Sequence, residues 1–342
     1  MRIPKIWWMV LPAALLLAQT PPKTGLQFSE FYLHDPYILA HKATRTYYLY
    51  NGAGPRQLGG QRAGVVTYKS KDLLHWDGPY TVFEVPDGLW ANPSEGVWAP
   101  EVHLYRGRYY LLATLHNSAK LLKYTDEDKL PVYNGKKAKP HMRGTQIFVA
   151  DTPDGPFVPL GNNPAPPPDF MTLDGTLFVE DGVPYMIYAH EWIQVLDGTM
   201  EAVALKPDLA ARAGEPFLLF KASEAPWVKD QGNNSSEKQP TYVTDGPCLY
   251  RTKTGKLLML WSSYRAGLYV ETLAYSTTAK LRGPWKQGDV LVGNDSGHGM
   301  LFESFDSKLM LVLHQPFRNA RGKLFEMEDT GDTLRIKRQI VN

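Results

Sequence analysis

The sequence predicts an all-β fold, a five-bladed β-propeller, because one hairpin pattern occurs five times along the 342 residues. In each repeat, apolar strands are joined by short turns rich in Gly, Asp, Lys or Arg, which is a strong hairpin signal. Repeats of this size are typical of propeller blades. They open with five related phrases: His34-Asp35-Pro36, Trp98-Ala99-Pro100-Glu101, Leu173-Asp174-Gly175, Thr244-Asp245-Gly246-Pro247 and Gly297-His298-Gly299.

The strands are predicted from runs of aromatic, β-branched and leucine residues, which favour pleated, half-buried segments. In chain order the runs are 47–50 and 65–68; 102–105, 109–114 and 145–150; 176–179, 185–188 and 201–205; 248–250, 257–261 and 270–275; 300–303, 309–313 and 324–327. A two-sheet sandwich also has many short strands, but it gives no reason for one phrase to open every repeat. We therefore expect one propeller domain over residues 25–342, with long loops at 120–142 and 225–239.

Residues 1–20 have the pattern of a secretory signal peptide. Arg2 and Lys5 give a positive start, and residues 6–18 form an apolar run of the length such signals have. A transmembrane anchor, the alternative, needs about 20 apolar residues. We expect a secreted or periplasmic protein with no membrane association after cleavage. Cys248 is the only cysteine, so the domain depends on its core rather than on disulfides.

The formal net charge of +2 gives no reason to expect nucleic acid or another polyanion as a partner. We expect a monomer.

Aspartates stand at the openings of three repeats, and this placement predicts a site. The inner strands of a propeller begin at the same end of the central channel, so Asp35, Asp174 and Asp245 are expected to project towards one another. Glu101 and His298 come from the other two repeats. Taken singly, an Asp before Gly or Pro is more often a turn residue. Together, closely spaced carboxylates acquire different pKa values, as glycosidic bond cleavage by an acid and a base requires.

These phrases resemble those of glycoside hydrolase family 43, the five-bladed propeller arabinosidases and xylosidases, from His34 to about Pro316. The resemblance implies that Asp35 is the general base and that Asp174 tunes the pKa of the acid and orients it. It further implies that the phrase at Trp98 and Glu101 walls the sugar site. His298 would face the channel, near a calcium or water site in several members. No cofactor is otherwise implied.

The fourth phrase departs from the family, which has a glutamate as its acid where this chain has Asp245. An aspartate is one methylene shorter, so its proton reaches less far. Glu191 is the alternative acid, because it follows an inner strand of the third repeat. The neighbouring Trp192 is a candidate for sugar binding, together with Trp98, Glu101 and His298.

The sequence thus predicts an exported, inverting glycoside hydrolase that acts on α-L-arabinofuranosides of plant polysaccharides. Two alternatives remain at this stage. One keeps the mechanism with a β-xyloside or β-galactofuranoside as substrate. The other is a propeller that binds carbohydrate without hydrolysing it.

Overall fold

The computed structural model describes residues 22–341, apart from 125–126, 134–135 and 229–240. The expected signal peptide at residues 1–20 therefore lies outside the described residues, as does most of the loop expected at 225–239. Among the described residues there is no helix that is long and apolar enough to cross a membrane.

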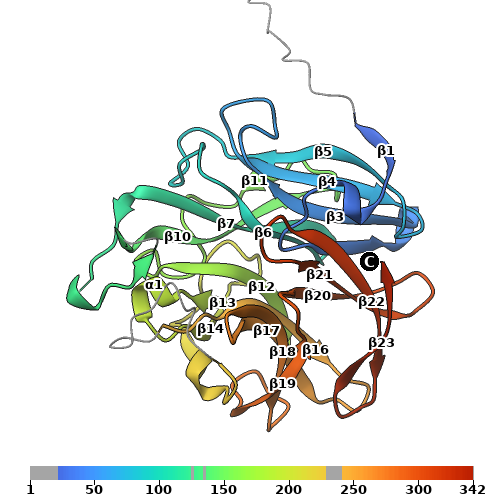
Figure 1. Ribbon diagram of the computed structural model, residues 1–342. Coiled ribbons are helices and arrows are strands. Elements are labelled where there is room, and N and C mark those ends of the chain that lie inside the picture. The colour runs from blue at the N-terminus through green and yellow to red at the C-terminus, as the bar shows by residue number, and fades with distance from the viewer. Residues whose placement is uncertain (1–21, 125–126, 134–135, 229–240, 342) are drawn as a thin grey trace, which may run out of the picture.

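Five antiparallel sheets stand around a common axis, which confirms the predicted five-bladed β-propeller (Figure 1). Each inner strand contacts the inner strands of both neighbouring blades. Blade one is β1 (Lys23–Leu26), β5 (Trp76–Glu84), β4 (Gly64–Ser70), β3 (Thr46–Ala53) and β2 (Tyr37–His41); blade two is β11 (Val158–Pro159), β10 (His141–Ala150), β7 (Arg108–Leu121) and β6 (Trp98–Tyr105). Blade three is β12 (Thr172–Glu180), β13 (Val183–His190), β14 (Thr199–Ala204) and β15 (Phe217–Lys221); blade four is β16 (Asp245–Arg251), β17 (Leu257–Arg265), β18 (Leu268–Ser276) and β19 (Trp285–Val292); blade five is β20 (Gly297–Glu303), β21 (Leu309–Gln315), β22 (Arg321–Asp329) and β23 (Leu334–Val341).

The segment 120–142, which the sequence predicts as a loop, is largely an extension of blade two. Strands β7 and β10 remain paired as far as Leu121 and His141. Two short strands, β8 (Val132–Tyr133) and β9 (Lys136–Lys137), pair beyond them. Figure 1 shows the resulting hairpin projecting from the ring. This segment is rich in lysine and has few apolar residues, so its sequence lacks the pattern that predicts a strand.

One backbone feature recurs at the start of every inner strand: a residue in the left-handed conformation. In four blades the pairing register shifts at this residue, as in a β-bulge that redirects a side chain. The five residues are Asp35 (φ 50°), Ala99 (φ 42°), Asp174 (φ 55°), Gly246 (φ 52°) and His298 (φ 55°).

The aspartates of the three phrases are therefore not all equivalent. Asp35 and Asp174 occupy the left-handed position itself, whereas Asp245 stands one residue before it. Asp245 corresponds to His34 of blade one. A β-bulge places consecutive residues on the same side of a strand, so both positions of the phrase can face the channel.

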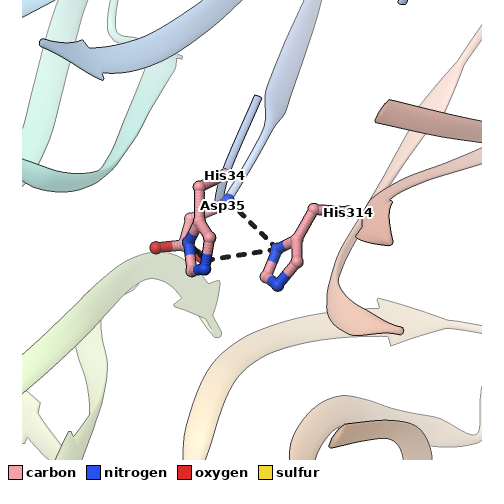
Figure 2. Close-up of side chains that lie close together, drawn as sticks. All are labelled: His34, Asp35 and His314. Atoms are coloured by element: carbon pink, nitrogen blue, oxygen red, sulfur yellow. Dashed lines mark hydrogen bonds and ion pairs between the residues drawn. The ribbon is translucent and has the colours of Figure 1, made fainter. Parts of the chain in front are cut away.

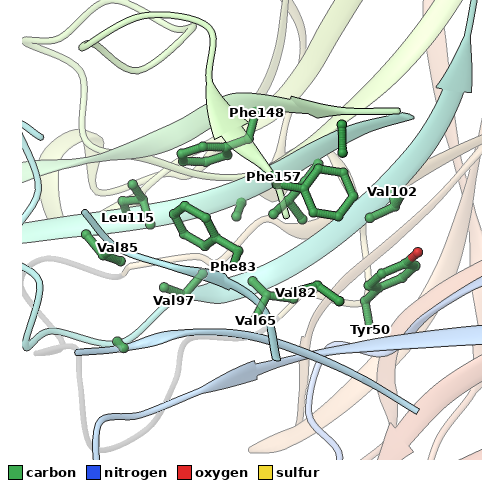
Figure 3. Close-up of a cluster of buried hydrophobic side chains, with 14 of the residues drawn as sticks. Tyr50, Val65, Val82, Phe83, Val85, Val97, Val102, Leu115, Phe148 and Phe157 are labelled. Atoms are coloured by element: carbon green, nitrogen blue, oxygen red, sulfur yellow. The ribbon is translucent and has the colours of Figure 1, made fainter. Parts of the chain in front are cut away.

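Apolar side chains from adjacent blades form the core between them. Figure 3 shows the cluster between blades one and two, where Phe83 and Val65 of blade one pack against Phe148 and Val102 of blade two. The rings of Phe83 and Phe148 lie 4.3 Å apart. Packing between neighbouring blades thus fixes their orientation, with their inner strands along the channel.

The ring closes between blades five and one without an exchanged strand in the described residues. Strand β1 pairs with β5 of its own blade, and blade five consists of β20–β23 in chain order. The two blades meet through one apolar cluster, in which Phe28 and Leu33 pack with residues of blade five such as Met310. The Leu33 N–H also donates a hydrogen bond to the Ala320 carbonyl, at 3.1 Å.

Substitution of Gly322 by alanine tests this seam. A Cβ at Gly322 would lie 2.6 Å from Cδ2 of Leu33 and 2.8 Å from Cδ2 of Phe28. We expect overpacking to lower the free energy of unfolding by about 1–3 kcal/mol, measured by urea denaturation. The control is Gly214→Ala, where a Cβ meets nothing within 4 Å. Equal stability of the two variants would contradict tight packing at the contact between blades five and one.

Candidate active site

A pocket of about 390 Å³ lies at the channel end where the inner strands begin. This volume lies within the range of small-ligand sites. Four predicted site residues line it: Asp35, Trp98, Asp174 and Asp245. The other lining residues are Tyr32, His34, Asn51, Gly52, Ala53, Gly54, Gly96, Val97, Ala99, Leu173 and Phe317.

Asp35 is surrounded by three histidines. Its Oδ1 lies 2.8 Å from Nδ1 of His34 and 3.1 Å from Nδ1 of His298. Figure 2 shows His314 beside His34 and Asp35, where its Nδ1 accepts a hydrogen bond from the Asp35 N–H at 3.2 Å. Burial opposes ionisation of the Asp35 carboxyl, but His298 and His34 hold its pKa well below the usual range. Asp35 is therefore an ionised carboxylate, the form that a general base requires.

His314 differs from its two neighbours in charge. Because its Nδ1 accepts a backbone N–H, its proton is on Nε2 and the ring is neutral. Burial and the neighbouring His34 hold the pKa of His314 well below the ordinary histidine value. His314 thus orients the Asp35 backbone and adds no positive charge.

His298 joins the three aspartates. Its Nδ1 lies 3.1 Å from Oδ1 of Asp35, 3.7 Å from Oδ2 of Asp174 and 4.0 Å from Oδ1 of Asp245. Burial opposes protonation of the imidazole, but the carboxylates raise the pKa of His298 well above its ordinary value. A protonated imidazolium therefore stands among three carboxyl groups.

Residues of blade four hold His298 in place. The backbone N–H of His298 donates a hydrogen bond to Oγ of Ser262 at 2.8 Å. The Ser262 hydroxyl in turn donates to Oε2 of Glu271 at 2.9 Å. Oε2 of Glu271 also accepts the N–H of Gly299, at 2.6 Å. Burial raises the pKa of Glu271 to about 8. The left-handed backbone at His298 is thus fixed on both sides.

Asp174 and Asp245 form a coupled pair of acids. Asp174 is the more deeply buried, with a side chain 4% exposed against 20% for Asp245. Oδ2 of Asp174 accepts the Gly246 N–H at 3.1 Å. Burial and the charge of Asp245 raise the pKa of Asp174 well above the usual range. The buried carboxyl of Asp174 therefore keeps its proton under conditions in which an isolated aspartate is ionised, and Asp245 is the more accessible of the two.

The carboxyl groups of Asp35 and Asp245 lie close to each other across His298. Oδ1 of Asp35 and Oδ1 of Asp245 are both measured from the same His298 nitrogen, so they are at most about 7 Å apart. Of the roughly 6.5–9.5 Å separations found in inverting glycosidases, only the shortest fall within this upper limit, which also includes the roughly 5–5.5 Å of retaining ones.

Glu191, the alternative acid, is engaged elsewhere. It immediately precedes the short helix α1 (Trp192–Val195), is buried, and forms an ion pair with Arg143. Nε of Arg143 donates to Nδ1 of His116 at 2.9 Å. The Arg143 guanidinium lies 4.6 Å from the centre of the Trp98 ring. Glu191 therefore supports the wall behind Trp98 and is not among the residues that line the pocket.

Sequence reasoning missed Arg143 and His116. Both belong to the paired extension of blade two, where they lie directly opposite each other. The prediction of a loop up to residue 142 concealed this pairing. An arginine and a histidine flanking a predicted loop are the only signal that the sequence offers.

Three predicted substrate-binding residues, Trp192, Glu101 and His298, are not among those that line the pocket. Trp192 is buried, with 8% of its surface exposed. Glu101 is also buried, and its Oε2 lies 2.7 Å from Nε2 of His103. Trp98, by contrast, is 43% exposed on the pocket wall.

The residues around His298 do not fit a calcium ion well. Donor atoms of Asp174, Asp245 and His298 lie within 4.8 Å of one another, but calcium takes six to eight oxygen ligands. Here one of the three donors is an imidazole nitrogen rather than an oxygen. One oxygen of each aspartate already accepts a hydrogen bond. The positive charge of this cluster is supplied by His298 itself.

Glu191→Gln tests the supporting role of this residue. Loss of the charge leaves the buried Arg143 without its ionic partner, so we expect the free energy of unfolding to fall by about 2–3 kcal/mol. Urea denaturation measures the change, with the exposed Glu215→Gln as control. A stability equal to that of the control would contradict the supporting role.

His298→Asn tests the charge at the centre of the site. The folded-state pKa of His298 is raised, so its stabilising effect is complete below the unfolded pKa of about 6.5 and is lost as pH rises through the folded pKa. We expect a deficit of about 3–5 kcal/mol at pH 6 that shrinks at alkaline pH. Urea denaturation from pH 6 to pH 10 measures it, with His41→Asn as control. A deficit that does not change with pH would show that His298 is neutral.

The solved structure of an endo-arabinase from Bacteroides thetaiotaomicron VPI-5482 is similar to this chain. The two are 35% identical, the match covers 90% of this chain and 98% of that one, and the TM-score is 0.75. An alpha-L-arabinofuranosidase from Lactobacillus brevis matches at 18% identity, with 91% and 97% of the chains covered and a TM-score of 0.65.

An endo-1,4-beta-xylanase from Bacteroides thetaiotaomicron VPI-5482 matches at 19% identity, with 91% and 96% covered and a TM-score of 0.66. At 18% and 19% identity the likeness shows the fold alone. No curated protein matches the chain. The family model described as glycosyl hydrolases family 43 matches residues 28–338, and the chain belongs to this family.

Proposed function

We propose that this glycoside hydrolase cleaves α-L-arabinofuranosyl linkages in arabinan by a single displacement that inverts the anomeric centre. The observation that carries the proposed reaction is the division of charge in the pocket. Asp35 has a lowered pKa and Asp174, beside Asp245, has a raised one, although all three are aspartates within a few ångströms of His298. Acid and base are thus assigned by their surroundings.

In this mechanism Asp35 is the general base. Its carboxylate accepts a proton from a water molecule as the water oxygen attacks the anomeric carbon. The positive charge of His298, 3.1 Å away, keeps Asp35 ionised before the reaction. The hydrogen bond from the Asp35 backbone to His314 fixes the direction in which the carboxylate points.

Asp245 is the general acid in this mechanism. It gives its proton to the glycosidic oxygen as the bond to the anomeric carbon breaks. The buried carboxyl of Asp174 favours the protonated state of the pair before the reaction, because two adjacent carboxylates resist a second ionisation. The charge that develops on Asp245 faces the His298 imidazolium at 4.0 Å.

The proposed substrate rests on the 35% identity with the endo-arabinase, which extends over nearly all of that chain. The exposed ring of Trp98 offers a flat apolar surface of the kind on which a sugar packs. A plant polysaccharide, which lies outside the cell that degrades it, also agrees with the export expected from residues 1–20. A β-xyloside or β-galactofuranoside in the same pocket would use the same three aspartates.

Asp35→Asn tests the proposed function. We expect the rate on debranched arabinan to fall by at least about 10³-fold, because the variant lacks the base, with circular dichroism unchanged. Release of reducing sugar is the measurement. Asp332→Asn is the control, since this residue forms an exposed ion pair with Lys256. Proton NMR of the first product should show the inverted anomer.

The substrate panel also contains arabinoxylan and the nitrophenyl glycosides of β-xylose and β-galactofuranose. Preference for one of these would replace arabinan as the substrate while leaving the mechanism intact. A retained anomer would refute single displacement. Binding of all sugars without turnover by the unaltered protein would favour a carbohydrate-binding propeller.

A further inference from the structure

The proposed acid, Asp245, has a second partner that the mechanism does not yet use. The hydroxyl of Tyr269 on β18 donates a hydrogen bond to Oδ2 of Asp245, at 2.6 Å. The Tyr269 side chain is fully buried. Burial and the Asp245 charge raise the pKa of Tyr269 well above its ordinary value, so the hydroxyl remains a donor. With Oδ2 accepting this bond, the proton of Asp245 is left to Oδ1, the oxygen on the His298 side.

Packing, rather than the bond to Asp245, fixes the Tyr269 ring. The ring is stacked on His314 at 5.6 Å with an interplanar angle of 12°. His314 in turn is stacked on His34 at 3.9 Å, and Phe317 packs against Tyr269 edge-on at 4.9 Å. A Cβ at Gly297 would lie 2.4 Å from the Tyr269 ring, so the glycine makes room for it.

This stack connects the two sides of the reaction. At one end, His34 contacts Oδ1 of Asp35 at 2.8 Å. At the other end, Tyr269 holds Oδ2 of Asp245. The rings between them are in contact and buried or nearly so. The aromatic stack therefore links a contact of Asp35 with a contact of Asp245.

We propose that Tyr269 is a positioning residue that holds the short acid Asp245 with Oδ1 directed at the leaving oxygen. This inference rests on the proposed function, because it takes Asp245 as the acid. The fixed phenol adjusts the site to an aspartate, whose side chain is one methylene shorter than glutamate. The hydrogen bond also strengthens as Asp245 loses its proton, since a bond to a charged acceptor is stronger than one to a neutral acceptor.

Tyr269→Phe tests the proposal, because it removes the hydroxyl and keeps the ring. The probes are two aryl α-L-arabinofuranosides, one that releases a methylphenol and one that releases a dinitrophenol. Dinitrophenolate leaves without a proton, whereas the methylphenol requires one. We expect kcat to fall by about 10²-fold for the methylphenyl substrate and to change less than about threefold for the dinitrophenyl substrate.

The matched control is Tyr275→Phe, on the same strand, whose hydroxyl bonds to Thr333 at 2.9 Å. It should leave both rates unchanged. Equal losses on both substrates in Tyr269→Phe would overturn the proposal, because they indicate a general disturbance of the pocket. Unchanged rates on both substrates would overturn it as well.

Asp245→Asn separates this inference from the proposed function. A loss confined to the methylphenyl substrate in Asp245→Asn, without such a loss in Tyr269→Phe, rejects only the role of Tyr269. If Asp245→Asn shows no dependence on the leaving group, the acid itself has been assigned wrongly.

Asp245→Glu supplies a second test that leaves Tyr269 intact, should Tyr269→Phe fail to fold. The longer acid does not fit a phenol placed for an aspartate, so we expect it to lose activity on the methylphenyl substrate at least tenfold more than on the dinitrophenyl substrate. A glutamate variant as active as the unaltered protein on both would contradict the proposal.

Discussion

One buried positive charge organises the site: the imidazolium of His298, placed among three carboxyl groups. Two unit charges 4 Å apart interact by about 4 kcal/mol at an effective dielectric constant of about 20. Three carboxyl groups gathered at one channel end would therefore repel one another strongly without a cation between them. His298 is closest to Asp35, at 3.1 Å, and lowers the pKa of that carboxyl, whereas burial and the neighbouring Asp245 raise the pKa of Asp174.

The backbone provides this arrangement before any side chain takes part. A left-handed residue at the start of each inner strand redirects the chain in all five blades. Such a conformation costs roughly 1–2 kcal/mol for a residue other than glycine, and aspartate tolerates it better than most. The strain at Asp35, Asp174 and His298 is compensated by hydrogen bonds that their backbone N–H groups donate to His314, Thr114 and Ser262, respectively.

The number of blades and the phrases that open them could be predicted from the sequence, because turn residues and apolar runs leave a direct record. The one-residue offset of Asp245 could not be predicted, since the sequence does not indicate that Gly246 rather than Asp245 takes the left-handed conformation. Tyr269 lies in an ordinary apolar strand pattern, where it looks like any core aromatic. Arg143 and Glu191 are 48 residues apart, and only the packing of blades two and three brings them together.

The seam between blades five and one also has a consequence for how the protein fails. Asp35 belongs to blade one, whereas His298 and His314 belong to blade five. In the described part of the chain, side-chain packing, a few hydrogen bonds and ion pairs such as Lys42–Glu303 join these blades, without a shared strand. A molecule that loosens there would keep most of its sheets, yet its base would move away from the charge that ionises it. The closed ring is therefore itself a condition for activity. On heating, we expect activity to be lost at a lower temperature than the β-sheet structure.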